Sequence, residues 1–246
     1  FILGISSGRW TADHNIHHGS PNKLGVDPGI EISLLAFCKK QALERRGLAH
    51  FMTKYQAYFW VPLLGLYGFN ARILDTITIS RNLLGQRVMN KLKNSAAEAF
   101  FVVTGSAIFF ILIFSMLDAW NAVLFVLISH ILTGIYLGSI FATNHKGMPI
   151  FEEGKDFLCA QVLTARNVKS NPFVGLWMGG LDYQIEHHLF PTMPRCNLKK
   201  AREIVKPYCK KHGIRYYETG FFNSYVEVLQ NFHRVSAVLR KPVANY

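Results

Sequence analysis

AFFVVTGSAIFFILIFSML (Ala99–Leu117) and WNAVLFVLISHILTGIYLGSIFAT (Trp120–Thr143) are two long stretches without a charged residue. A helix needs about twenty apolar residues to cross a hydrocarbon core about 30 Å thick, and each stretch is long enough. The connection Leu117-Asp118-Ala119-Trp120-Asn121 contains no positive charge. Because positive charge gathers on the cytoplasmic side of membrane proteins, residues 96–144 are predicted to form a transmembrane hairpin whose turn faces away from the cytosol.

The composition supports a membrane protein with a basic cytoplasmic face. Half of the 246 residues are apolar, yet the formal net charge is +12. The positive charges crowd residues 39–46, 72–93 and 195–215, all outside the hairpin. A nucleic-acid binder would place basic and aromatic residues on a soluble fold without long uncharged segments, so we expect no nucleic-acid partner. The four cysteines show no paired C-x-x-C spacing, which favours free thiols over a thiolate zinc site.

Two groups of histidines repeat one helical spacing far apart in the chain. The first is His14, His17 and His18, and the second is Gln184, His187 and His188. Positions i, i+3 and i+4 share one face of a helix, so each group presents convergent side chains. Neutral imidazole is the commonest protein ligand for iron, zinc and copper. Ordinary surface or core histidines are the alternative, but two groups at matching spacing favour a metal site.

A shared metal centre also constrains the topology. If both histidine groups bind at one centre, they lie on the same side of the bilayer, and an even number of spans separates them. Tyr55–Phe69 is uncharged but is only about fifteen residues long, roughly 22 Å of helix, and it contains Pro62. The two spans of the hairpin satisfy the condition. Tyr55–Phe69 is therefore predicted to be interfacial or re-entrant.

The predicted fold is all-α, an integral membrane helical protein with a cytoplasmic helical cap. Residues 1–30 hold the first histidine group and a loop, residues 31–94 form interfacial helices, and residues 145–246 form the cap with the second histidine group. Individual helices are expected over Glu31–Arg46, Asn70–Asn94, Glu152–Asn171, Leu198–Lys211 and Phe221–Leu239. Because the chain begins with Phe1 rather than Met, we expect it to start partway into a longer protein.

These residues resemble the membrane fatty acid desaturases, specifically the front-end acyl desaturases. That family has a second histidine box H-x-x-H-H and a third box Q-x-x-H-H, which match His14–His18 and Gln184–His188. The context Trp177-x-Gly179-Gly180-Leu181 and His188-Leu189-Phe190-Pro191 is similar to that of the family's third box. The resemblance covers nearly the whole chain, residues 1–246, as the C-terminal part of one desaturase domain. The family's first box is expected upstream.

The resemblance implies a histidine-rich diiron site. Ligands carried over from it are His14, His17, His18, His187 and His188, together with His145, which is similar to an extra ligand at the end of the last span. Asn144 is expected to act through a water molecule, and Gln184 to hydrogen-bond a ligand or bound water, because an amide is a poor iron ligand. Asp13, Asp182 and Glu186 either orient imidazole N–H groups or are helix-surface charges. His130 lies about 22 Å along the helix from His145, too deep to join the site.

The resemblance also implies an oxidoreductase. We expect an O2-dependent front-end desaturase that inserts a double bond into an acyl-lipid or acyl-CoA substrate between an existing double bond and the carboxyl end. Its iron ions would cycle between Fe2+ and Fe3+ with electrons from ferredoxin or cytochrome b5, an acidic protein suited to the basic face. The alternatives are a membrane diiron fatty acyl or alkyl hydroxylase and a sphingolipid desaturase. A metal transporter would instead place its ligands within the bilayer.

Overall fold

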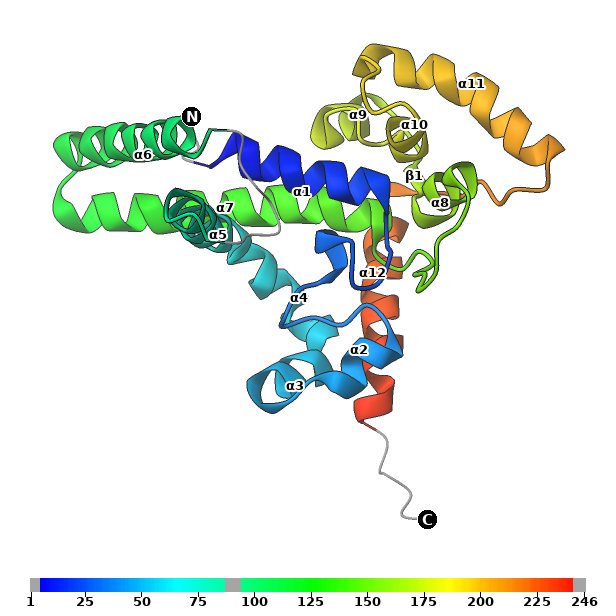
Figure 1. Cartoon of the computed structure of the whole chain (residues 1–246), viewed down its shortest axis with the longest axis horizontal. Coiled ribbons are helices and arrows are strands. Elements are labelled where there is room, and N and C mark those ends of the chain that lie inside the picture. The colour runs from blue at the N-terminus through cyan, green and yellow to red at the C-terminus, as the bar shows by residue number, and fades with distance from the viewer. Residues whose placement is uncertain (1–4, 87–93, 241–246) are drawn as a thin grey trace. The chain divides into compact units, whose positions relative to one another are not determined.

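The computed structural model describes residues 5–86 and 94–240, and most of them are helical (Figure 1). The elements are α1 Ser7–Gly19, η1 Pro28–Ile30, α2 Lys39–Glu44, α3 Gly47–Lys54, α4 Gln56–Gly65, α5 Tyr67–Leu83, α6 Ser95–Met116, α7 Ala119–His145, α8 Phe157–Thr164, β1 Asn167–Val168, α9 Pro172–Met178, α10 Gln184–Leu189, α11 Arg195–Lys211, β2 Glu218–Thr219, α12 Phe221–Ser236 and η2 Ala237–Leu239. They form two compact units. The first unit is Phe1–Asn15 with Val61–Ser139, and the second unit is Ile16–Trp60 with Ile140–Tyr246.

The long apolar helices α6 and α7 dominate the first unit. Both are long and apolar enough to cross a membrane, with mean hydropathies of 2.4 and 2.0 over their most apolar stretches. Only 6% and 28% of those stretches is buried within the protein, unlike the core helix of a soluble domain. The predicted apolar hairpin is thus present as two helices. The second helix runs two residues past Thr143, which brings His145 into its last turn.

Contacts within the first unit fix the start of α1. Asp75 is fully buried and accepts hydrogen bonds from the backbone N–H of Ser6 and from the guanidinium of Arg9. Glu98, in the first turn of α6, accepts from the Ser6 hydroxyl at 2.7 Å and from the backbone N–H of Gly8 at 3.1 Å. The helix that carries the first histidine group is therefore held at its N-terminus by two carboxylates.

The segment Tyr55–Phe69 divides between α4, which contains Pro62, and the start of α5. A Cβ atom on Gly68 would lie 2.9 Å from the carbonyl oxygen of His130, so only glycine permits this approach to the middle of α7. The His130 ring stacks on Phe69 with centroids 5.1 Å apart. Its Nδ1 lies 2.8 Å from the Val126 carbonyl oxygen, so this histidine is satisfied locally, as expected.

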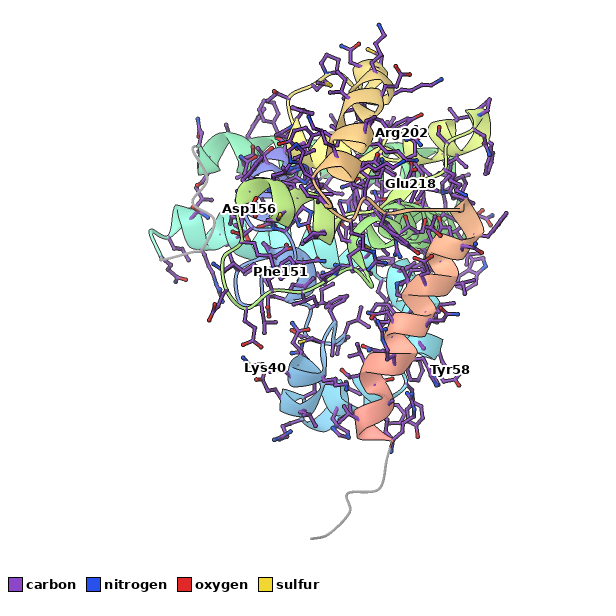
Figure 2. The ribbon with its side chains drawn as sticks, turned by 90° about the vertical axis from the view of Figure 1, so that its right-hand side faces the viewer. Lys40, Tyr58, Phe151, Asp156, Arg202 and Glu218 are labelled. Atoms are coloured by element: carbon purple, nitrogen blue, oxygen red, sulfur yellow. The ribbon has the colours of Figure 1, made fainter. Side chains whose placement is uncertain are left out.

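The second unit has its main core between α8, α10 and α11. The core residues are Val162, Ala165, Ile185, Val205 and Cys209, all buried. The amphipathic helix predicted over Leu198–Lys211 is α11, which begins three residues earlier. Arg202 on α11 donates to Glu218 on β2 at 2.7 Å (Figure 2). Strands β1 and β2 pair in parallel, and this pairing ties the chain after α8 to the chain before α12.

A smaller core joins α2 to the end of α12. The helix predicted over Phe221–Leu239 is present as α12 followed by η2. The Gln56 side chain fixes this end of the unit. Its Oε1 accepts from the backbone N–H of Ala36 at 2.8 Å, and its Nε2 donates to the carbonyls of Ala36 at 3.0 Å and of Phe232.

Several predicted helices are shorter than expected. The prediction of a helix over Glu31–Arg46 is wrong for residues 31–38, which are not in an α-helix. There the side chains of Gln41 and Arg45 form hydrogen bonds with backbone groups that would otherwise bond to each other within a helix. Within Glu152–Asn171 only α8 is helical, because Asp156 caps its first turn and the chain then enters β1. The helix expected over Asn70–Asn94 ends at Leu83, and residues 87–93 of that prediction and 1–4 of the N-terminal apolar segment lie outside the described residues.

Candidate metal centre

Helix α10 holds the second histidine group and is fixed by polar contacts. Helix α9 ends at Gly179, which has a left-handed backbone with φ of 58°, so the chain can turn before α10 begins. Asn167 Oδ1 accepts from the backbone N–H of Ile185 at 2.8 Å. The Glu186 carboxylate accepts from the Asn167 amide and the Tyr216 hydroxyl, each at 2.7 Å. Glu186 thus anchors the helix.

Three histidines from three helices form the first candidate group in the second unit. They are His17 of α1, His145 of α7 and His188 of α10, and one ligand atom of each lies within 4.8 Å of the others. The Nε2 atoms of His17 and His145 are 3.3 Å apart. The ring centroid of His188 lies 4.9 Å from that of His17 and 4.5 Å from that of His145. His145 and His188 are buried.

Each of the three rings turns its Nδ1 toward an oxygen acceptor. The His17 Nδ1 lies 2.9 Å from the Asp27 carboxylate, and the His145 Nδ1 lies 3.0 Å from the carbonyl oxygen of Thr164. The His188 Nδ1 lies 2.8 Å from Gln161 Oε1. An oxygen acceptor selects the tautomer with the proton on Nδ1, which leaves the lone pair on Nε2. Three lone pairs therefore point to one place.

This arrangement fits a metal ion. With their protons on Nδ1, the Nε2 atoms of His17 and His145 direct lone pairs toward each other across 3.3 Å, and a metal ion between them would relieve the repulsion. His188 Nε2 is buried without a hydrogen-bond partner among the described residues. With metal–nitrogen bonds of about 2.0–2.1 Å, two ligands on one ion are separated by about 3.0–3.4 Å. The measured separation falls in that range. All-imidazole ligation suits iron, copper, nickel or zinc.

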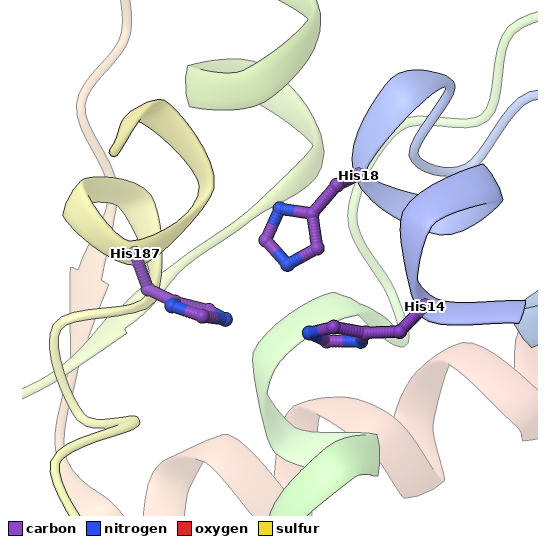
Figure 3. Close-up of side chains that lie close together, drawn as sticks. All are labelled: His14, His18 and His187. Atoms are coloured by element: carbon purple, nitrogen blue, oxygen red, sulfur yellow. The ribbon is translucent and has the colours of Figure 1, made fainter. Parts of the chain in front are cut away.

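His18 and His187 form the start of a second group. Figure 3 shows the side chains of His18 on α1 and His187 on α10 extending toward each other, and their rings are nearly perpendicular with centroids 4.8 Å apart. Helix α1 is continuous, so His14 stands one turn before His18 on the same helix face. His18 and His187 are therefore candidate ligands of a second ion, and the part of His14 in it stays a prediction. The His18 ring also stacks on His188 at 4.2 Å, which joins the second group to the first.

Gln184 and Asn144 meet beside the first group. Asn144 Nδ2 donates to Gln184 Oε1 at 2.8 Å and to the Leu181 carbonyl at 3.2 Å. This fixes the Gln184 amide so that its N–H group donates to His145 Nε2 at 3.0 Å, a bond that an ion at this nitrogen would replace. Asn144 Oδ1 is buried without a hydrogen-bond partner among the described residues. Both amides therefore lie next to the converging nitrogens, and the water-mediated role expected of Asn144 stays a prediction.

The remaining polar residues singled out from the sequence have other positions. Asp13 pairs with Arg9 at 2.8 Å, and Asp182 is buried with no partner for its carboxylate within the described residues. Arg195 donates to the Gly179 carbonyl at 2.6 Å. Two other histidines, His212 and His233, are exposed to solvent.

The protonation states around the site favour metal binding. Burial, with the nearby charge of Arg195, lowers the pKa of His187 to about 4. Burial also holds the pKa of His188 well below its ordinary value. Burial acts to raise the pKa of Asp27, but the hydrogen bond from His17 and the charges of His17 and Lys146 outweigh it and leave this pKa lowered. At neutral pH His187 and His188 are thus neutral ligands, and Asp27 is a charged acceptor.

The metal-free protein should lose stability on acidification. The pKa of His187 is about 4 in the folded chain and about 6.5 when unfolded. As pH falls from about 6.5 to about 4, the unfolded chain binds a proton that the folded chain does not, so the free energy of unfolding decreases. His188 acts in the same direction. Thermal unfolding of iron-free protein in detergent across this range measures the effect, and a midpoint that rises on acidification would contradict it.

The acceptors of the Nδ1 protons were missed by the sequence analysis. Asp27 lies in a glycine-rich loop, and Gln161 is the one amide side chain within the apolar helix FLCAQVLT. A fully buried glutamine in such a helix signals a buried hydrogen-bond partner, although its identity depends on the fold. Gln161 also donates to the carbonyl of His18 at 2.8 Å, so one amide holds both histidine helices.

Replacing Gln161 with leucine is expected to weaken iron binding by about 10–100-fold, the usual loss when a hydrogen-bond partner of a metal ligand is removed. The His188 ring would lose the acceptor that sets its tautomer. Retention of iron against increasing chelator in the purified full-length protein measures this. The matched control is Gln56→Leu, which removes an equally buried glutamine bonded only to backbone. Equal iron affinity in the two variants would refute the role of Gln161.

Comparison with known proteins places this arrangement in a family. The model of the fatty acid desaturase family matches residues 1–220. The chain is 31% identical over 248 residues to an acyl-lipid (9-3)-desaturase of Physcomitrium patens, covering 96% of this chain and 45% of that protein. It is 29% identical to a delta(6)-fatty-acid desaturase of Caenorhabditis elegans, covering 99% and 57%, and 29% identical to a delta(8)-fatty-acid desaturase of Helianthus annuus, covering 99% and 55%.

The chain spans about half the length of these curated relatives. No solved structure matches it. The family match covers both histidine groups, His145 and the two long apolar helices. The chain therefore belongs to the fatty acid desaturase family.

Proposed function

We propose that the full-length protein is a front-end acyl desaturase, an O2-dependent oxidoreductase that inserts a double bond on the carboxyl side of an existing one. The observation that carries the proposal is the convergence of Nε2 atoms from His17, His145 and His188 in a chain of this family. The relatives include delta(5), delta(6) and delta(8) desaturases, which supports this reaction class.

The proposed cofactor is a pair of iron ions. One ion would bind His17, His145 and His188, and the other would bind His14, His18 and His187. Each ion needs further ligands, which the family's first histidine box would supply. The irons would provide the reduction of O2 that removal of hydrogen from an unactivated methylene requires.

The chain's own polar residues would control the site in three ways. Asp27, Gln161 and the Thr164 carbonyl hold the Nδ1 protons and so keep the Nε2 lone pairs directed inward. Gln184, fixed by Asn144, would offer its N–H groups to a water or a polar group beside His145. Burial of these residues would keep bulk water away from the reacting carbons.

The proposed topology places the site at the cytoplasmic edge of the membrane. Helices α6 and α7 would be the two spans between the histidine boxes, with Tyr55–Phe69 entering the bilayer without crossing it. The close approach of Gly68 to His130 in the middle of α7 supports the re-entrant form of this segment over a surface one. The electron donor, ferredoxin or cytochrome b5, would dock on a basic face. Helix α11 offers exposed Lys199, Lys200, Lys206 and Lys210 for an acidic partner.

Product analysis tests the proposal. The full-length gene product is expressed with polyunsaturated acyl precursors, and the fatty acids of each lipid class are analysed. A new double bond on the carboxyl side of an existing one is expected. A hydroxy acid as sole product would reject desaturation in favour of the hydroxylase, and a change confined to sphingolipids would reject the acyl-lipid or acyl-CoA substrate.

A further inference from the structure

Helices α9 and α12 expose a patch of large apolar side chains in the second unit. The patch consists of Phe173, Leu176 and Trp177 of α9 with Phe222 and Val226 of α12. Leu176 is 82% exposed and Phe222 is 78% exposed, so these side chains pack against little of their own chain. The Phe221 ring lies 5.9 Å from that of Phe173 and 5.3 Å from that of Phe222, so the two helices bring these groups together. Neighbouring exposed apolar groups mark a binding surface, for a protein or for a membrane.

The inner side of α9 packs against the end of α7. Val174 and Met178, each 2% exposed, form a buried cluster with Ile140 in the last two turns of that helix. Phe141 and Phe221 pack on the same cluster. Helix α9 and the start of α12 are therefore attached directly to the end of the helix that is apolar enough to cross a membrane.

The length of α7 sets the depth of this contact. A hydrocarbon core about 30 Å thick is crossed by about twenty residues at 1.5 Å each. Counted from Ala119, twenty residues end near residue 138, so Ile140 and Phe141 lie just outside the hydrocarbon. A helix with its side chains is about 10–12 Å across. Because α9 packs directly on Ile140, it lies within about one helix diameter of the point where α7 leaves the hydrocarbon.

We propose that the α9–α12 patch is an interfacial membrane anchor, which inserts among phospholipids at the membrane surface without crossing the bilayer. Tryptophan and phenylalanine are enriched at this depth, and none of the five patch residues carries a charge. Lys169, exposed just before α9, is placed to stay in the headgroup layer. The assignment requires that α7 crosses a bilayer, and it does not depend on desaturation.

The anchor would fix the height of the histidine helix above the bilayer. Helix α9 leads through Gly179 and Gly180 into α10, with four residues from Gly180 to Tyr183 before Gln184. A patch seated in the interface therefore holds His187 and His188 close to the plane where an acyl chain leaves the hydrocarbon. The anchor would thus position these histidines where the acyl chain of a lipid can reach them.

Depth-dependent quenching of tryptophan tests the anchor. Since the apolar helices alone would hold the protein in a membrane, the depth of the patch has to be measured rather than membrane binding. The full-length protein is reconstituted into phosphatidylcholine vesicles with bromine atoms at a shallow or a deep acyl position. The emission of Trp177 is obtained as the difference between the unmodified protein and Trp177→Phe. Phe222→Trp in the Trp177→Phe background reports the second part of the patch.

The matched control is Ile204→Trp in the same background. Ile204 is 74% exposed, but it lies on α11 between lysines and away from the end of α7. Shallow bromines are expected to reduce the emission of Trp177 and of Phe222→Trp, and to leave that of Ile204→Trp unchanged. Absence of quenching at either patch position would overturn the proposal and indicate a protein contact, such as a second copy. Equal quenching at all three positions would also overturn it.

Discussion

Replacing His188 with alanine is expected to abolish desaturation by the full-length protein and to remove most of its iron. His188 is 1% exposed, belongs to the first ligand group and stacks on His18 of the second. Its loss leaves His17 and His145 as a pair and withdraws support from His18. The loss of iron affinity should exceed the roughly 10–100-fold expected when only an outer hydrogen bond to a ligand is removed. Metal analysis of purified protein and acyl product analysis measure the two effects.

Two controls separate loss of a ligand from loss of the fold. His130→Ala removes another buried histidine, whose Nδ1 bonds the Val126 carbonyl, and iron content should stay near normal. Gln161→Leu leaves the His188 ligand itself in place, so its iron loss should be smaller than that of His188→Ala. An intact, monodisperse His188→Ala protein that retains iron and turnover would defeat the assignment of the site.

The features predicted correctly from the sequence depend on local spacing or on long apolar runs. Three histidines at positions i, i+3 and i+4 share a helix face whatever the rest of the chain does, and α1 presents His14, His17 and His18 in that way. Helices α6 and α7 could be predicted from the two uncharged runs for a similar reason, because the length and composition of a run do not depend on tertiary contacts. The role of His145 as a ligand was predicted from the resemblance to the family and not from local spacing. No spacing rule could predict it, because only the fold brings His145 next to His17.

The features that were missed depend on contacts between distant segments. Asp27 reaches His17 through a loop, and Gln161 reaches His188 across 27 residues of sequence, so no spacing rule identifies either. The irregular chain before α2 was predicted as helix because its apolar content resembles that of a surface helix. Gln41 and Arg45 bind its carbonyls from positions that a linear pattern does not show. Side-chain contacts between distant segments thus caused the first error, and side-chain hydrogen bonds to the backbone caused the second.

Arg166 is the missed residue with the largest expected effect on the fold. Its side chain is 1% exposed and donates through Nε to the Thr143 carbonyl and through Nη2 to the Lys146 carbonyl at 2.5 Å. Its backbone N–H donates to the Asn144 carbonyl at 3.0 Å. The last carbonyls of a helix have no partner within the helix. Arg166 therefore satisfies the end of α7 on both sides of His145, and its charge favours the negative end of the helix dipole.

Glu227 completes this arrangement as the counter-ion. Its carboxylate lies 2.5 Å from Arg166 Nη1 and also accepts from the hydroxyls of Tyr217 and Thr219, at 2.9 and 2.7 Å. A buried guanidinium needs such a partner, because an unpaired buried charge is strongly destabilising. The ion pair therefore links α12 to the helix end that carries Asn144 and His145.

Arg166→Met is expected to lower the free energy of unfolding by about 3–5 kcal/mol, the usual effect of removing one partner of a buried ion pair. It also leaves the carbonyls of Thr143 and Lys146 without their donors, so iron affinity should fall with stability. Arg166→Lys keeps a charge but offers no planar fork, and it should be intermediate. Glu227→Gln keeps the guanidinium on the helix end and should retain more iron than Arg166→Met.

Denaturant unfolding in detergent measures the free energy of unfolding of these variants, and chelator competition measures their iron affinity. Unfolding of Arg166→Met at the midpoint of the unmodified protein would contradict this role, because the end of α7 would then be held without the guanidinium.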